Sequence, residues 1–142
     1  MILCDSGPLI AVAVRDDAHY NECTTLFTGL RLAGHRLLVP ATVVAEVGYM
    51  LEQRVGPTVE AAFLQAVAEG AFELVNLDPE DLARMAWLVG RYDDLPLGTT
   101  DASVIALAER LGVSEVATLD QRHFRVVRPR HVDALTLLPE VR

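Results

Sequence analysis

Short apolar segments without polar alternation recur along this chain, and segments with helical spacing separate them. A strand that is apolar on both sides must be covered on both faces, which is typical of a parallel sheet between helices. Strands are expected at residues 2–4, 37–39, 72–77 and 115–120, with a fifth short strand near 124–127. This order predicts one α/β domain over residues 1–142, with a four- or five-stranded, mainly parallel sheet flanked by helices.

The chain is long enough for one hydrophobic core, and no segment indicates export or membrane insertion. Its 142 residues are 51% hydrophobic, a composition typical of globular proteins. The first residues, MILCDSG, contain no basic region, and no apolar run approaches the roughly 20 residues of a membrane span. Cys4 and Cys23 have neither CxxC spacing nor a disulfide framework. We therefore expect a cytoplasmic protein.

The absence of lysine excludes several kinds of enzyme. All 12 basic residues are arginine. A P-loop nucleotide site requires the lysine of its GK[ST] motif, and Schiff-base chemistry requires a lysine amine. Phosphoaspartate enzymes and receiver domains also place Asp at strand ends, but they rely on a lysine at the phosphoryl site. None of these mechanisms is available to this chain.

A single carboxylate, Glu46, interrupts the apolar run VVAEVGYML at residues 43–51. On a helix its neighbours three and four positions away include Val43 and Met50, so it is expected to share a face with apolar groups. Burying an unpaired carboxylate is costly, so Glu46 should be protonated, paired or bound to a cation. A salt bridge to an arginine, or a helix end that reaches solvent, are the alternatives.

Asp5 and Asp120 each follow an apolar segment that is predicted to be a strand. In open α/β sheets, ligands bind just beyond the carboxyl ends of the strands. Each Asp taken alone is also explained as a helix cap or turn residue.

A fourth carboxylate, Asp101, begins a strongly apolar helix and is expected to face the same side as Val104 and Ile105. The helix dipole alone also favours an acid at this position.

Together these carboxylates predict a metal site. If the strands before Asp5 and Asp120 are neighbours, their ends lie about 5 Å apart, and the following helices can bring in Glu46 and Asp101. Four converging carboxylates repel one another unless a divalent cation neutralises them. Oxygen ligands favour Mg²⁺ or Mn²⁺, as one ion or as two about 4 Å apart, which suits phosphodiester cleavage. The four histidines show no zinc-type spacing, and His123 is interpreted as a surface or packing residue.

The arrangement of these residues resembles the PIN-domain ribonucleases, and within them the VapC toxins of toxin–antitoxin pairs. The likeness extends from residue 1 to about residue 130. It rests on Asp5 in ILCDSGPLIA, Glu46 in PATVVAEVGYML, Asp101 in LPLGTTDASVIALAERLG and Asp120 in VATLDQRHFRVVRP.

The resemblance implies an endoribonuclease that depends on Mg²⁺ or Mn²⁺. It assigns Asp5 and Asp101 as the principal metal ligands. Glu46 would complete the ligand set or orient its water, and Asp120 would be an outer or second-metal ligand. Water would attack the phosphodiester and leave a 5′-phosphate, so the 2′-hydroxyl of RNA serves recognition.

The same resemblance implies two supporting hydroxyls and a protein partner. Ser6 and Thr118 are expected to support the carboxylates by hydrogen bonds. The family is usually homodimeric and is held by a cognate antitoxin whose tail blocks the site. Such antitoxins often insert an arginine, which the carboxylates here would suit.

The net charge of −8 argues against a general nucleic-acid binder, but the charge is segregated. Residues 122–131, RHFRVVRPRH, contain four arginines and no acid, so the rest of the chain carries a net −12 (−8 minus +4). Arg122 and Arg125 follow Asp120 closely and are candidates to line an RNA path. A solvated strand edge explains the same segment.

Two other functions fit the same residues. A metal-dependent DNA or flap nuclease uses a similar acidic cluster, although the small size and the lack of inserted loops argue against it. A non-catalytic protein-binding module would use the acids only as helix caps.

Overall fold

The computed structural model describes residues 1–140, and the last two residues of the domain expected over 1–142 lie outside the described part. Strands and helices alternate along the chain, as expected. The strands are β1 (Ile2–Cys4), β2 (Leu37–Pro40), β3 (Glu73–Val75), β4 (Glu115–Ala117) and β5 (Thr136–Leu138). The helices are α1 (Ser6–Ala13), α2 (Tyr20–Leu32), α3 (Ala41–Val55), α4 (Pro57–Ala68), α5 (Pro79–Arg91), α6 (Thr99–Leu111) and α7 (Gln121–Val126).

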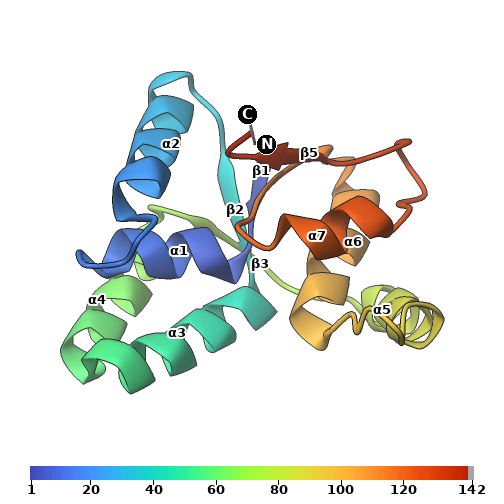
Figure 1. The fold of residues 1–142 in the computed structure, drawn as a ribbon, viewed down its shortest axis with the longest axis horizontal. Helices are drawn as coiled ribbons and strands as arrows, with labels where there is room; N and C mark the ends of the chain where they lie inside the picture. Colours follow the sequence, from blue (N-terminus) through green and yellow to red (C-terminus); the bar gives the residue numbers. More distant parts are fainter. Residues whose placement is uncertain (141–142) are drawn as a thin grey trace.

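The strands form one parallel sheet in the order β3-β2-β1-β4-β5. Helices α1 to α4 lie on one side of the sheet, and α5, α6 and α7 lie on the other (Figure 1). The chain moves outward from β1 to β2 and β3, then crosses back to β4 and β5. Right-handed crossovers in opposite directions place their helices on opposite faces. The neighbouring ends of β1 and β4 therefore form the switch point, where an open α/β sheet holds its ligands.

The central strands are apolar because both of their faces are covered. Every residue of β1 and β2 is buried, and so are Val116 and Ala117 of β4. The outer strands β3 and β5 are largely exposed or half-buried. The lack of polar alternation in the central strands thus has a direct structural cause.

The fifth strand predicted near residues 124–127 is wrong. This segment lies in helix α7 and its end, and the fifth strand is β5 at Thr136–Leu138. Phe124 and Val127 are buried, whereas Arg125 and Val126 between them are exposed. Burial at a spacing of three residues is that of a helical turn, so this short apolar run follows a helical period and not a strand period.

Helix α6 is held by ion pairs with α5. The guanidinium of Arg84 makes two hydrogen bonds of 2.8 and 2.9 Å to the carboxylate of Glu109, and both side chains are about nine-tenths buried. Arg110 pairs with the buried Asp81 at 3.0 Å. These contacts fix the helix whose first turn carries Asp101. Among the helices of residues 1–140, none is long and apolar enough to cross a membrane.

Candidate functional site

Asp5 lies at the switch point of the sheet, directly after β1 and before the first residue of α1. Cys4 pairs in register with Ala117 of β4, so the next residue on each strand, Asp5 and Thr118, are also neighbours. The hydroxyl of Thr118 donates a hydrogen bond of 2.8 Å to Asp5 Oδ2, and both residues are buried. The backbone N–H of Asp120 donates to the same hydroxyl at 3.1 Å. Thr118 therefore links the two strand-end acids.

The environment of Asp5 opposes its ionisation. Burial raises its pKa from 3.8 to about 6, although hydrogen bonds from the Ser6 backbone and from Thr118 act in the opposite direction. The negative charges of Asp101 and Glu46 raise the pKa further. A carboxylate that is desolvated beside other carboxylates is stabilised when a cation joins the group.

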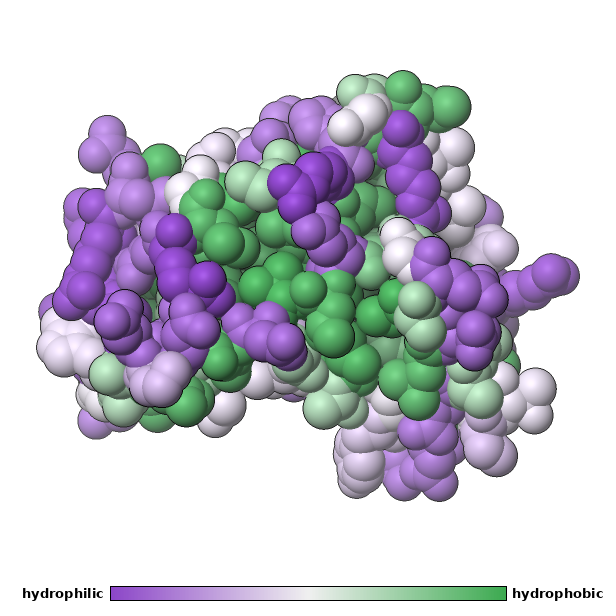
Figure 2. Space-filling model, turned by 180° about the vertical axis from the view of Figure 1, so that it is seen from behind, coloured by the Kyte–Doolittle hydropathy of each residue, from purple (hydrophilic) through white to green (hydrophobic). Residues whose placement is uncertain are grey.

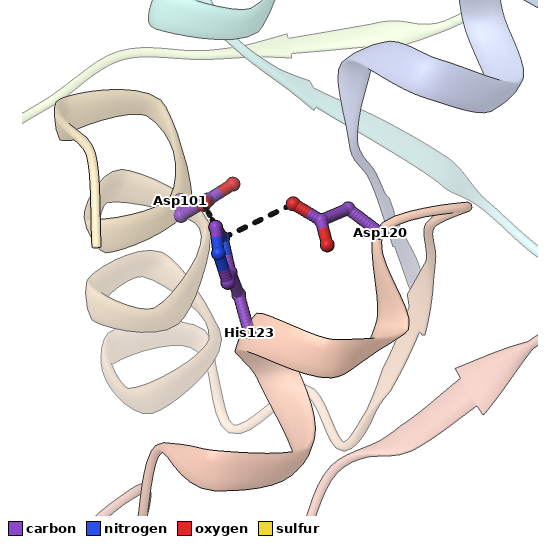
Figure 3. A group of neighbouring side chains, drawn as sticks. All are labelled: Asp101, Asp120 and His123. Carbon is purple, nitrogen blue, oxygen red and sulfur yellow. Dashed lines mark hydrogen bonds and ion pairs between the residues drawn. The ribbon is translucent and has the colours of Figure 1, made fainter. Parts of the chain in front are cut away.

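Asp101, Asp120 and His123 come together although they lie on different elements. Figure 3 shows the imidazole of His123 between the two carboxylates. His123 Nδ1 lies 2.8 Å from Asp101 Oδ2 and 3.0 Å from Asp120 Oδ2. One potential ligand atom from each of the three residues lies within 4.8 Å of the others. This set is suited to holding a metal ion.

The interpretation of His123 as a surface or packing residue is wrong. Its side chain is 20% exposed, and it contacts both acids. The signal was present in the sequence: because α7 begins directly after Asp120, a residue three positions on returns to the same side. Only the tertiary structure, however, places Asp101 against the same nitrogen.

Burial is also the largest effect on Asp101. It raises the pKa of this carboxyl, while the contact with His123 lowers it and the charges of Asp120 and Glu46 raise it. Asp101 and Asp5 therefore belong to one electrostatically coupled group that includes Glu46.

Glu46 does not share the buried face of α3, so that expectation is wrong. The core face of the helix consists of Val43, Val47 and Leu51, at positions four residues apart. Glu46 is exposed, as are Tyr49 and Met50. The run is apolar on nearly every side, so its periodicity did not distinguish the two faces. Glu46 stands at the solvent side of the group and acts on Asp5 and Asp101 through its charge.

A hydroxyl pair joins the helices that carry Glu46 and Asp101. Thr42 of α3 and Ser103 of α6 share a hydrogen bond of 2.6 Å, and the Ser103 hydroxyl also lies 2.6 Å from the carbonyl oxygen of Thr100. Thr42 is one helical turn before Glu46, and Ser103 is two residues after Asp101. This contact joins the two helices close to both acids in the sequence.

Ser6 does not support the carboxylates through its side chain. Its Oγ is buried, yet within residues 1–140 it has no hydrogen-bond partner. Its contribution to Asp5 comes from the backbone N–H. The hydrogen bond expected of Thr118 is present, and the one expected of the Ser6 hydroxyl is not.

A pocket of about 570 Å³ opens beside Asp120. Arg122 and Arg125 of α7 line it and are exposed, and the side chain of Arg125 donates to Gln121 at 3.0 Å. His19 and Glu22 also line it. Among the four predicted acids, Asp120 alone lines this pocket, so Arg122 and Arg125 border the acidic group at Asp120.

The residues present fit a divalent cation. Two carboxylates and an imidazole converge, the charge of Glu46 raises the pKa values of Asp5 and Asp101, and the buried Ser6 hydroxyl lacks a partner in the described chain. Oxygen-rich sets of this kind suit Mg²⁺ and Mn²⁺, and an imidazole suits transition metals.

Residues 2–129 match the PIN domain family. The chain is 33% identical to Ribonuclease VapC26 of Mycobacterium tuberculosis over 141 residues, which are 97% of this chain and 100% of that protein. The chain therefore belongs to the PIN domain family, which confirms the resemblance inferred from its acidic motifs.

Solved structures share the fold at low sequence identity. The crystal structure of Mycobacterium tuberculosis VapC20, a sarcin-ricin loop cleaving toxin, is 15% identical and aligns with a TM-score of 0.73 over 82% of this chain and 87% of that one. VapBC2 from Rickettsia felis, bound to a DNA fragment from its promoter, is 14% identical with a TM-score of 0.67 over 96% and 97%. FitAcB from Neisseria gonorrhoeae is 16% identical with a TM-score of 0.64 over 85% and 88%. The predicted α/β fold with a parallel sheet is confirmed.

Proposed function

We propose that this chain is a VapC-type endoribonuclease, the toxin of a toxin–antitoxin pair, and that it hydrolyses RNA with Mg²⁺ or Mn²⁺. The observation that carries the proposal is the convergence of Asp101, Asp120 and His123 near the switch point between β1 and β4, where Asp5 is linked to Asp120 through Thr118 and coupled to Asp101 by charge. It occurs in a chain that aligns over its length with a protein named as a ribonuclease. Asp5, Glu46, Asp101 and Asp120 are the proposed catalytic and metal-binding residues.

Each acid has a distinct task in this proposal. Asp5 and Asp101, the more buried pair, would hold the cation, and Asp120 would complete the set from the solvent side. The exposed carboxylate of Glu46 is accessible to water and would orient the attacking molecule. Thr118 keeps the Asp5 carboxylate in place through its hydrogen bond. A divalent cation in such a site activates water and stabilises charge on the leaving oxygen.

The RNA backbone would approach along α7. Arg122 and Arg125 border the pocket beside Asp120 and offer the cationic groups that phosphates require. The acids alone would repel RNA, so these arginines and the bound cation together offset the negative charge of the site.

The proposed protein partners are a cognate antitoxin and a second copy of the chain. Figure 2 shows a broad band of apolar side chains across one face of the molecule, with hydrophilic groups around it. Large exposed apolar areas of this kind are typical of protein interfaces. In the Rickettsia felis structure the VapBC2 proteins are bound to promoter DNA, which supports an antitoxin as a partner here.

Cleavage of total cellular RNA by the purified chain tests the proposal. The reaction is run with Mg²⁺, with Mn²⁺ and with EDTA, beside Asp5→Asn and the exposed control Asp133→Asn. We expect metal-dependent cleavage that Asp5→Asn abolishes and Asp133→Asn retains. Cleavage that persists in EDTA, or in Asp5→Asn, would contradict the proposal.

Matched RNA and DNA strands separate the remaining alternatives. Cleavage of the RNA strand alone supports the ribonuclease, whereas preferential cleavage of DNA or of a flap substrate would indicate the DNA nuclease. A chain that binds a partner protein but cleaves neither strand under any metal condition would be the non-catalytic module.

A further inference from the structure

The position of His123 is determined by the packing of α7. The next residue, Phe124, is 2% exposed and anchors the helix in the core. This directs the imidazole toward Asp101 and Asp120 (Figure 3). Its side chain is 20% exposed. The ring is therefore held at the acidic group and does not extend freely into solvent.

The contacts of Nδ1 are not accounted for by a single hydrogen bond. The nitrogen lies 2.8 Å from one carboxylate oxygen and 3.0 Å from another. One hydrogen on Nδ1 points at only one of them. Ligand atoms that lie about 2.1 Å from an ion and at right angles to each other are about 3 Å apart, which matches both separations.

We propose that His123 Nδ1 is a ligand of the divalent cation, together with Asp101 and Asp120, and that it makes the site selective for Mn²⁺ over Mg²⁺. The inference rests on the proposed function, because it concerns the same acidic group. Imidazole nitrogen is a good ligand for transition metals and a poor one for Mg²⁺, which prefers oxygen and water. A site of four carboxylates would not discriminate in this way.

Pulsed electron paramagnetic resonance of bound Mn²⁺ tests this directly. The full chain is stripped of metal and loaded with one equivalent of Mn²⁺. We expect echo modulation from a directly coordinated ¹⁴N nucleus, which changes to the ¹⁵N pattern when the protein carries ¹⁵N-histidine. This comparison uses only the wild-type sequence, so it does not depend on whether a variant folds.

Variants then assign the nitrogen among the four histidines. His123→Ala should lose the modulation, and His19→Ala, which alters the histidine lining the pocket beside Asp120, should retain it. In titration calorimetry, His123→Ala should bind Mn²⁺ on the order of tenfold to a hundredfold more weakly, with Mg²⁺ affinity changed by less than about threefold.

The possible failures are distinguishable. If Mn²⁺ binds the wild type without nitrogen modulation, or if His123→Ala binds Mn²⁺ equally well, His123 is not a ligand and the inference is overturned while the acidic site stands. If the wild type binds no Mn²⁺ in the calorimeter, both the inference and the proposed metal site are overturned.

Discussion

The hydroxyl of Thr118, at the end of β4, donates a hydrogen bond of 2.8 Å to the carboxylate of Asp5, at the end of β1. Both residues are buried, and the parallel register of the two strands places them side by side. The central acid of the site thus depends on a neighbouring strand for its orientation.

Thr118→Val should therefore affect both stability and activity. The change keeps the shape of the side chain but leaves the buried Asp5 carboxylate without this donor, which should lower the free energy of unfolding by about 1–3 kcal/mol. RNA cleavage should fall on the order of tenfold to a hundredfold. Thr118→Ser keeps the donor and should restore most of both losses. Urea unfolding and a cleavage assay measure them, and equal activity in the Val and Ser variants would show that the hydrogen bond is not needed.

The metal-free protein should lose stability as the pH rises through the range in which Asp5 ionises. Its pKa is about 6 in the folded chain and 3.8 as the ordinary value, so between these values the folded state holds a proton that the unfolded state has released. The stability associated with this proton is present below the ordinary pKa and lost above the folded one. The difference in unfolding free energy between wild type and Asp5→Asn should fall by at most roughly 3 kcal/mol from about pH 4 to pH 7. Urea titrations in EDTA measure it, and a difference that does not vary with pH contradicts the raised pKa.

Asp101→Asn should abolish cleavage and yet stabilise the metal-free fold. Burial and the charges of Asp120 and Glu46 disfavour the ionised carboxylate, so the neutral amide relieves that cost. An increase of about 0.5–2 kcal/mol in the free energy of unfolding is expected. Melting curves in EDTA give the sign, and added Mn²⁺ should reverse the order of wild type and variant. Destabilisation in EDTA would instead indicate that Asp101 has a structural role in its helix.

Replacing Arg122 and Arg125 together by alanine should weaken RNA binding and its dependence on salt. Each lost contact to a phosphate of a single strand should reduce the slope of log K against log salt by about 0.7. Fluorescence anisotropy in EDTA measures binding without cleavage. Arg36→Ala is the matched control, because Arg36 directly precedes β2, at the amino end of that strand and away from the carboxyl ends that carry the site, and it pairs with Glu73. A slope that the double variant leaves unchanged would exclude these arginines from the RNA path.

Arg84→Met should destabilise the fold by about 2–4 kcal/mol, because it leaves the largely buried Glu109 without its cation. Replacing Glu109 by Met in the same chain should recover part of the loss. The recovery is incomplete because Glu109 also accepts a hydrogen bond from the backbone N–H of Arg130. Arg91→Met, an exposed change on the same helix, should alter stability by less than about 0.5 kcal/mol. A double-mutant cycle in urea measures the coupling, and additive losses would mean that the two side chains act independently.

Several features of the fold and site were predictable from the sequence. Asp5 and Asp120 were each expected after an apolar strand, and the two strands that precede them, β1 and β4, do pair. Asp101 was expected in the first turn of its helix, and it lies there. These features are local: apolar runs specify strands, and the residue that follows a strand is already at its carboxyl end.

Sequence patterns that fit more than one local structure were not sufficient to predict the fold at two places. Residues 124–127 are compatible with a strand or a helical turn, and packing of Phe124 and Val127 decided for the helix. The helix around Glu46 is apolar on nearly every side, so the sequence did not show which side faces the core. The burial of Glu46 was therefore predicted wrongly.

The order of the first four strands and their helices, the parallel sheet and the position of Asp5 directly after a strand could be read from the sequence, because they follow from hydrophobic periodicity and chain connectivity. The position of the fifth strand, the buried face of α3 and the location of His123 between Asp101 and Asp120 depend on tertiary packing. Those contacts join residues on different elements, and their geometry depends on how helices pack against the sheet, which no local pattern encodes.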